Sequence, residues 1–182
     1  MDLKTSTTIR LTCAPGLAPL LETEVRQLGW PITSVDDAGI NTTGTLIDAM
    51  RLNLHLRTAF YVLYLIDEFP CQTPEDLYRH VSFLEWEKLL PSDGYLSIIS
   101  RTDTPAINNW TYATMKAKDA IVDRLAEKTG RRPDSGPQRN RCVINLYWRK
   151  DHCWIYLNTS GQKLSDRSYR RIPHKAPMQE TL

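Results

Sequence analysis

The feature that most constrains this chain is the order of hydrophobic patterns in residues 1–66. Short runs rich in β-branched and aromatic residues alternate with stretches in which leucine recurs at helical spacing. The runs predict strands and the leucine-rich stretches predict helices. The expected order is therefore strand, helix, strand, strand, helix, strand.

The expected strands are Thr8–Thr12, Ile32–Val35, Gly39–Thr43 and Ala59–Ile66, and the expected helices are Leu17–Leu28 and Leu46–Leu56. This order is typical of the ferredoxin-like fold, a four-stranded antiparallel sheet with two helices on one face. We expect the inward helix faces to be formed by Leu17, Leu20, Leu21, Val25 and Leu28, and by Leu46, Ala49, Met50 and Asn53. A fold this common does not identify a function.

A second unit is expected to begin at Asp67. Thr73 followed by Pro74 and two acids is a strong helix start, and we expect the helix to pack through Leu77, Val81, Phe83, Leu84 and Trp86. A strand is predicted over Tyr95–Ser100, and a hairpin is predicted from Cys142–Trp148 and Cys153–Thr159. This second unit should be mixed α/β.

The longest helix is predicted within Asn108–Pro133. Ala113, Ala117, Ile121 and Leu125 recur at helical spacing, and Gly130 and Pro133 mark the end of the helix. Lys128, Arg131 and Arg132 gather at this end. These cations could simply complement the negative pole of the helix, or they could bind phosphate.

The charge is divided unevenly along the chain. Residues 1–100 carry 7 Lys or Arg against 13 Asp or Glu, whereas residues 101–182 carry 16 against 8. A basic half on a nearly neutral chain indicates an anionic partner, with nucleic acid as the leading candidate. A soluble surface followed by a basic tail is the alternative.

The sequence offers no catalytic constellation. No glycine-rich turn follows a predicted strand, and His55, His80, His152 and His174 lie in separate predicted elements. The cysteines Cys13, Cys71, Cys142 and Cys153 are scattered, so we expect reduced thiols and no metal. No apolar run is long enough for a membrane span or a signal peptide, and we expect a cytoplasmic protein.

Residues 161–182 differ from the rest in having many cations and few apolar residues, which predicts a basic linker. Arginines can bind phosphates bidentately, and Tyr169 among them could stack on an unpaired base. The alternative is that Tyr169 packs on the preceding unit while the arginines are solvated or pair with Asp166.

Two blocks of residues carry a resemblance to a known family. The run Lys118–Arg124, followed by Gly130 and Arg132-Pro133, resembles the THUMP domain of RNA-modification enzymes. The second block is similar to the bridge between THUMP and the catalytic domain in bacterial 23S rRNA guanine-N2-methyltransferases; it comprises Ser160-Gly161, Leu164, Arg167, Tyr169-Arg170, Ala176-Pro177, Glu180 and Leu182. A ferredoxin-like domain ahead of THUMP matches that family's layout.

The resemblance implies an α+β chain with a ferredoxin-like domain at 1–66, a THUMP RNA-binding domain at 67–160 and a linker at 161–182 toward a methyltransferase domain. It also implies S-adenosylmethionine as the cofactor of that downstream domain, no cofactor in the present residues, and no Asn-Pro-Pro catalytic signature here. The expected partners are 23S rRNA, or other structured RNA, and the downstream domain.

The residues expected to contact RNA are cations and one tyrosine. They are Lys116, Lys118, Arg124, Lys128, Arg131, Arg132, Arg139, Arg141, Lys163, Arg167, Tyr169, Arg170 and Arg171. Two alternatives remain: a THUMP protein that methylates or thiolates tRNA, and a module whose basic arm docks on a protein.

Overall fold

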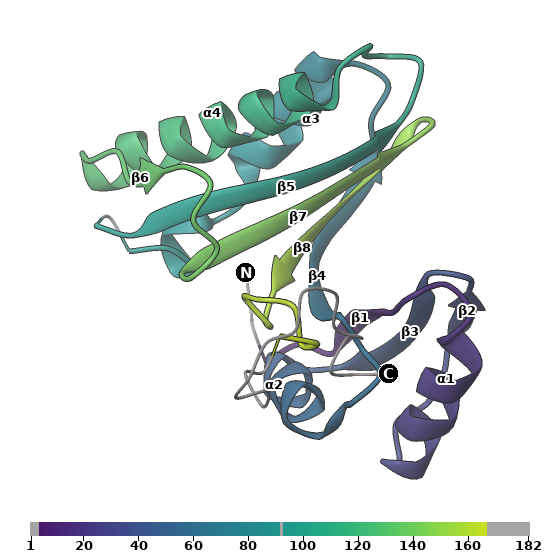
Figure 1. The fold of residues 1–182 in the computed structure, drawn as a ribbon. Coiled ribbons are helices and arrows are strands. Elements are labelled where there is room, and N and C mark those ends of the chain that lie inside the picture. Colours follow the sequence, from purple (N-terminus) through teal and green to yellow (C-terminus); the bar gives the residue numbers. More distant parts are fainter. Residues whose placement is uncertain (1–3, 92, 167–182) are drawn as a thin grey trace, which may run out of the picture. The chain divides into compact units, whose positions relative to one another are not determined.

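The computed structural model describes residues 4–91 and 93–166, which form two compact units (Figure 1). Of the described residues, those from 65 to 157 form the second unit, and residues 4–64 together with 158–166 form the N-terminal unit. Strand β4 (Tyr61–Pro70) contributes its first residues to the N-terminal unit and the remainder to the second unit.

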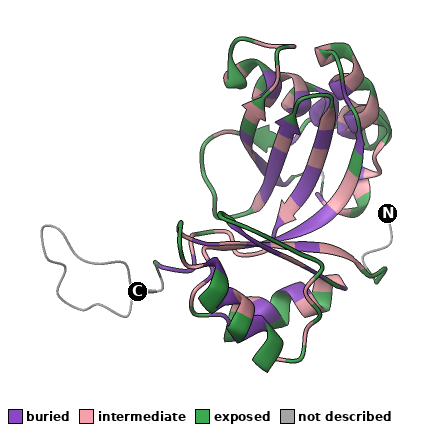
Figure 2. Ribbon diagram, turned by 90° about the vertical axis from the view of Figure 1, so that its right-hand side faces the viewer, coloured by how far each residue is buried: buried purple, intermediate pink, exposed green. Residues whose placement is uncertain are grey.

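The N-terminal unit contains β1 (Thr7–Thr12), α1 (Ala18–Gln27), β2 (Ser34–Asp36), β3 (Gly39–Gly44), α2 (Leu46–His55) and the start of β4. The strand order is β2-β3-β1-β4, and the β2–β3, β3–β1 and β1–β4 pairs are all antiparallel. Both helices cover the same face of these strands (Figure 2). The predicted ferredoxin-like fold is confirmed.

Local sequence explains the turns of this unit. Gly39 begins β3 at φ 149°, and a Cβ atom there would come within 1.9 Å of the Leu11 carbonyl oxygen of β1, so the close approach of β3 to β1 requires glycine. Helix α2 starts with a capping box, in which the Thr45 hydroxyl accepts from the Asp48 amide and the Asp48 carboxylate accepts from the Thr45 amide.

The second unit contains the rest of β4, α3 (Pro74–Phe83), the short 3₁₀ helix η1 (Trp86–Lys88), β5 (Tyr95–Asp103), α4 (Trp110–Thr129), β6 (Asp134–Ser135), β7 (Cys142–Arg149) and β8 (His152–Asn158). Its strand order is β4-β8-β7-β5-β6. Strand β5 is parallel to both β6 and β7, and β7 is antiparallel to β8. The predicted mixed α/β architecture is confirmed.

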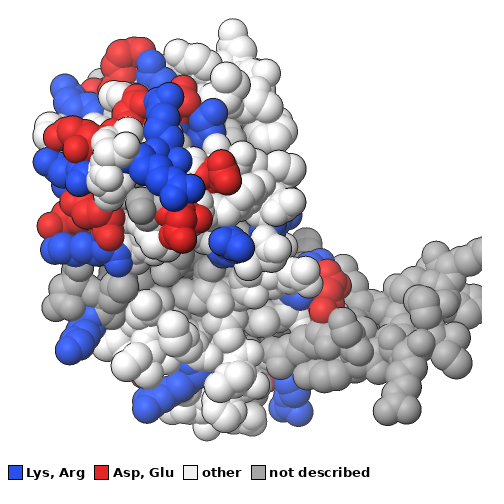
Figure 3. Space-filling view, turned by 90° about the vertical axis from the view of Figure 1, so that its left-hand side faces the viewer, with Lys and Arg blue, Asp and Glu red and all other residues white. Residues whose placement is uncertain are grey.

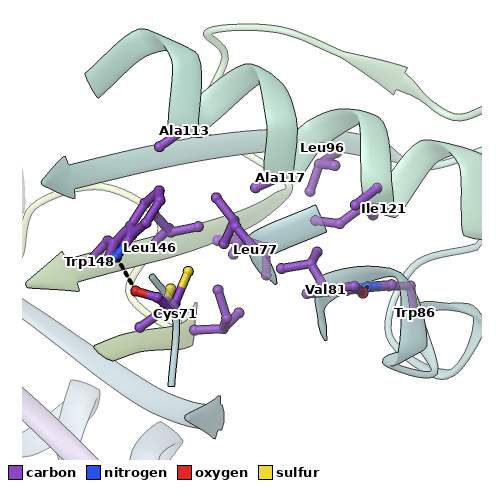
Figure 4. Close-up of a cluster of buried hydrophobic side chains, with 14 of the residues drawn as sticks. Cys71, Leu77, Val81, Trp86, Leu96, Ala113, Ala117, Ile121, Leu146 and Trp148 are labelled. Carbon is purple, nitrogen blue, oxygen red and sulfur yellow. Dashed lines mark hydrogen bonds between the residues drawn. The ribbon is translucent and has the colours of Figure 1, made fainter. Parts of the chain in front are cut away.

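Helices α3 and α4 pack on one face of this sheet and enclose the core (Figures 1 and 4). The predicted apolar stripe of α4 is confirmed, because Ala113, Ala117, Ile121 and Leu125 are all buried. Two buried indoles satisfy their N–H groups on backbone carbonyls: Trp86 Nε1 donates to Val81 at 2.7 Å, and Trp148 Nε1 donates to Cys71 at 2.9 Å.

Three predicted core positions are wrong. Leu20, Met50 and Phe83 are exposed by 58%, 54% and 73% respectively. In each helix the buried stripe runs through neighbouring positions, such as Leu21 and Val25 in α1, and consecutive helix residues are rotated by about 100°. A residue next to the stripe therefore points to solvent even when it is apolar.

The segment after β8 is packed against the N-terminal unit rather than extended. The Leu164 amide donates to the Phe60 carbonyl at 2.8 Å, and Leu164 and Ser165 are buried. The predicted linker thus begins with ordered residues, and its part from Arg167 onward lies outside the described residues. The four cysteines are free thiols. None of the described helices has both the length and the apolarity needed to cross a membrane.

Candidate nucleic-acid interface

Helix α4 carries four of the predicted RNA-contacting cations, Lys116, Lys118, Arg124 and Lys128. It begins at the N-cap Asn109, whose side chain accepts from the Thr111 amide at 2.9 Å, and continues for 20 residues. Gly130 ends it in the left-handed conformation at φ 72°, as the sequence predicts. The end of α4 lies at the same end of the unit as the starts of β5 and β7 (Figure 1). We call this end of the second unit, where α4 ends and β5 and β7 start, the basic end.

Two of the predicted phosphate ligands already have acidic partners. Arg124 forms a bidentate pair with Glu87 of η1, with Nε and Nη2 at 3.2 and 2.8 Å from the two carboxylate oxygens. Arg132 pairs with Asp123, which also accepts a hydrogen bond from the Tyr78 hydroxyl at 2.8 Å. These contacts join α4 to η1 and to α3.

The electrostatics of these groups agree with their pairing. The hydrogen bond from Arg124 lowers the pKa of Glu87, and the reciprocal bond raises the pKa of Arg124. The hydrogen bond from Tyr78 lowers the pKa of Asp123, with Arg132 adding to the effect, and the same contact raises the pKa of Tyr78. All four groups are therefore held in the protonation states that they have at neutral pH.

The lysines of α4 are also close to acids. Lys116 Nζ lies 3.3 Å from Glu75 and near the rings of Tyr78 and Tyr112. Lys118 and Lys128 lie 3.4 and 3.1 Å from the adjacent Asp119 and Glu127. Pairs this exposed are weak, so a phosphate can compete for these two lysines.

Three predicted arginines remain available. Arg131, Arg139 and Arg141 are exposed, and within residues 4–91 and 93–166 they form no ion pair. Figure 3 views this side of the second unit and shows Lys and Arg interleaved with Asp and Glu. The basic end is therefore a mixed surface in which individual arginines, rather than a continuous patch, are free to bind an anion.

Lys163 lies in the N-terminal unit, and its Nζ sits 3.6 Å from the centroid of the Phe60 ring. This cation–π contact gives Lys163 a structural role. Arg167, Tyr169, Arg170 and Arg171 lie outside the described residues.

The sequence analysis missed Arg101 and Trp110. Arg101 is exposed on β5 and has no acidic partner among the described residues, and Trp110 is 57% exposed at the first position of α4. Both line one groove of the second unit. Trp110 precedes Ala113 by three residues and so falls in line with the apolar stripe of the helix, which means that helical spacing could not predict its exposure. Arg101 also carried no signal, since only the edge position of its strand makes it notable.

Comparisons with known proteins agree with this architecture. Residues 8–63 match the RlmL ferredoxin-like domain family, and residues 71–158 match the THUMP domain family. The chain is 34% identical over 171 residues to ribosomal RNA large subunit methyltransferase K/L of Syntrophotalea carbinolica, covering 94% of this chain and 24% of that protein. It is 33% identical over 172 residues to the Pseudomonas aeruginosa protein of the same name, with the same coverage. The chain thus spans about a quarter of the length of these relatives.

Solved structures show the same fold. A structure from Listeria monocytogenes described as a predicted N6-adenine-specific DNA methylase aligns with a TM-score of 0.83 and 28% identity, over 97% of this chain and 46% of that one. SMU.472, solved in complex with SAH, aligns with a TM-score of 0.81 and 26% identity, over 98% of this chain and 47% of that one. The chain therefore carries an RlmL ferredoxin-like domain followed by a THUMP domain.

Proposed function

We propose that this chain is the RNA-binding N-terminal region of a large-subunit rRNA guanine-N2-methyltransferase that acts in the cytoplasm. Its role is to position 23S rRNA for a catalytic domain that uses S-adenosylmethionine. The observation that carries the proposal is the pairing of an RlmL ferredoxin-like domain with a THUMP domain in one chain. The names of the curated relatives support rRNA over tRNA as the substrate.

The geometry supports a specific division among the predicted RNA-contacting residues. Arg131, Arg139 and Arg141 are exposed and have no acidic partner within the described part of the chain, so they can bind phosphates without breaking a contact seen there. Lys118 and Lys128 can exchange weak exposed partners for phosphate. Lys116 and Arg124 bridge α4 to α3 and to η1, and Arg132 pairs with the Asp123 carboxylate that also accepts from Tyr78 of α3, so we assign these three mainly to the fold. Contacts to phosphates position RNA but do not read its sequence.

The test is the salt dependence of binding to a structured fragment of 23S rRNA. Each phosphate contact releases counterions, so three to four contacts should give a slope of log affinity against log salt of roughly −3. The double variant Arg131→Ala with Arg141→Ala should reduce this slope by about 1 to 2.

A matched control removes two cations from the N-terminal unit. Arg26 and Arg51 are exposed on α1 and α2, and among the residues that the structure describes they pair only with acids of their own helices. The double variant Arg26→Ala with Arg51→Ala makes the same change in net charge and should leave the slope unchanged. Affinity that does not respond to salt would refute RNA binding through phosphates.

A second candidate is a docking role for the basic segment after Asp166, with the downstream catalytic domain as its partner. The ordered anchoring of Leu164 and Ser165 on the N-terminal unit favours it, because the segment then leaves from a fixed point. Replacing Arg167, Arg170 and Arg171 with Ala separates the two roles. Docking predicts lost association with the catalytic domain and unchanged RNA affinity, whereas RNA guidance predicts weaker RNA binding.

A further inference from the structure

Between β5 and α4 the second unit has a groove of about 730 Å³, which we call the β5–α4 groove. One wall is the edge of β5, the other is the first half of α4, and one end is closed by the loop after β6. Its lining includes Ile98, Arg101, Trp110, Met115, Lys118 and Arg139.

The β5 wall is an open strand edge. Strand β6 pairs only with Tyr95 and Leu96, and past Leu96 no other strand of the described residues pairs with β5 on this side. From Ile98 to Asp103 this leaves a free edge of roughly 17 Å, at about 3.3 Å per residue. Backbone N–H and C=O groups along such an edge are available to hydrogen-bond a ligand.

The α4 wall presents apolar surface that the fold does not bury. Trp110 and Met115 are 57% and 56% exposed. The backbone of Trp110 is nevertheless fixed: its carbonyl accepts from the Ser100 hydroxyl at 3.1 Å, and that hydroxyl also lies 2.5 Å from the Thr114 hydroxyl. The indole therefore stands on a rigid helix start while its ring remains open to a ligand.

The charged side chains that line the groove are positive. Arg101, Lys118 and Arg139 line it, and none of the described residues in its lining is acidic. Side chains alternate along a strand, so Arg101 lies on the face opposite Ser100, which contacts α4. Cations thus flank the open edge on both sides, in contrast to the mixed charges of the basic end. The occupant should be anionic and extended, and it should carry flat apolar groups.

We propose that the β5–α4 groove holds an unpaired segment of the RNA, with a base stacked on Trp110 and phosphates at Arg101, Lys118 and Arg139. This inference rests on the proposed function and assigns a second binding mode to it, because the basic end needs only phosphates. Proteins that hold single-stranded nucleic acid combine a basic groove with aromatic side chains in this way. An acidic peptide added to the β5 edge is the competing occupant, and it would not use the ring face of Trp110.

The experiment compares two RNA hairpins with the same stem, one blunt and one with a 3′ overhang of about six uridines. Wild-type protein should bind the overhang hairpin more tightly. Trp110→Ala should weaken binding of the overhang hairpin about tenfold, the size of one lost base–aromatic stack, and leave the blunt hairpin unchanged. Trp110→Phe should restore most of the loss. Arg139→Ala should weaken the overhang hairpin more than the blunt one.

The matched control is Phe83→Ala. Phe83 is an aromatic residue of α3 that is 73% exposed and does not line the groove, so its loss should affect neither hairpin. Equal affinity of wild-type protein for both hairpins, or equal behaviour of Trp110→Ala and Phe83→Ala, would overturn the groove assignment. The proposed function would survive that result if blunt-hairpin binding still weakened with salt.

The last measurement tests the competing occupant, with an acidic peptide of about eight residues as the probe. Binding of this peptide that is retained in Trp110→Ala and lost in Arg139→Ala, with no benefit from the overhang, would overturn the RNA assignment in favour of a protein partner. If neither hairpin binds at any salt concentration, the proposed function itself fails. The overhang, the Trp110 variants and the salt series therefore separate the two claims.

Discussion

At the scale of single residues, Glu24 is a carboxylate that the fold needs in its charged form. It is buried on α1, and four donors from the loop after α2 converge on it: the amides of Arg57 and Thr58 at 2.8 and 3.1 Å, the Thr58 hydroxyl at 2.7 Å and the Arg57 Nε at 3.3 Å. Burial alone would raise its pKa, but the hydrogen bonds from Thr58 and Arg57 outweigh burial and leave the pKa of Glu24 lowered.

We expect Glu24→Gln to destabilise the N-terminal unit by about 2 kcal/mol at neutral pH, because an amide places its own N–H against donors. A lowered folded-state pKa contributes stability above the unfolded pKa of about 4.3, and that stability is lost as the pH falls through the folded value. The difference between wild type and variant in urea unfolding should therefore shrink toward pH 3. Glu22→Gln, on the exposed side of the same helix, is the control; a difference that is independent of pH would contradict the assignment.

At the scale of elements, the bidentate pair between Arg124 and Glu87 joins α4 to η1, and both side chains are largely shielded from solvent. We expect Arg124→Met and Glu87→Gln each to destabilise the second unit by about 1 kcal/mol, with a coupling of similar size in the double variant. RNA affinity should not change. If Arg124→Met reduced the salt slope as much as Arg131→Ala, Arg124 would be an RNA contact after all.

Element starts and ends were readable from the sequence wherever a side chain caps the backbone. Thr73 and Asp76 form a capping box, and Gly130 takes the left-handed conformation, as their positions predict. It was harder to predict which apolar helix residues are exposed to solvent, because Met50 and Phe83 are as apolar as their buried neighbours. The partners in ion pairs could not be predicted either. Arg124 pairs with Glu87, which is 37 residues away in the sequence, so the pattern predicted the position of the cation but not its partner.

At the scale of the whole molecule, residues far apart in the sequence complete the N-terminal unit. The Ser160 hydroxyl accepts from the Val62 amide at 2.8 Å and donates to Asn53 at 2.7 Å, while the Thr159 hydroxyl donates to the Val62 carbonyl at 2.8 Å. The sequence predicted a linker over residues 161–182 because they include many cations and few apolar residues. The packing of residues 158–166 depends on long-range hydrogen bonds such as these, which periodicity does not reveal.

We therefore expect Ser160→Ala to destabilise the N-terminal unit by about 1 to 3 kcal/mol, because the Val62 amide loses the acceptor that the segment supplies. Hydrogen exchange should accelerate at β1 and β4 residues of this unit and remain unchanged in α3 and α4. Ser82→Ala removes a hydroxyl that, among the described residues, hydrogen-bonds only to the Arg79 carbonyl on an exposed helix face, and it should alter neither region. Unchanged exchange in Ser160→Ala would show that residues 158–166 lie on the N-terminal unit without stabilising it, whereas faster exchange confined to this unit would make them part of the domain.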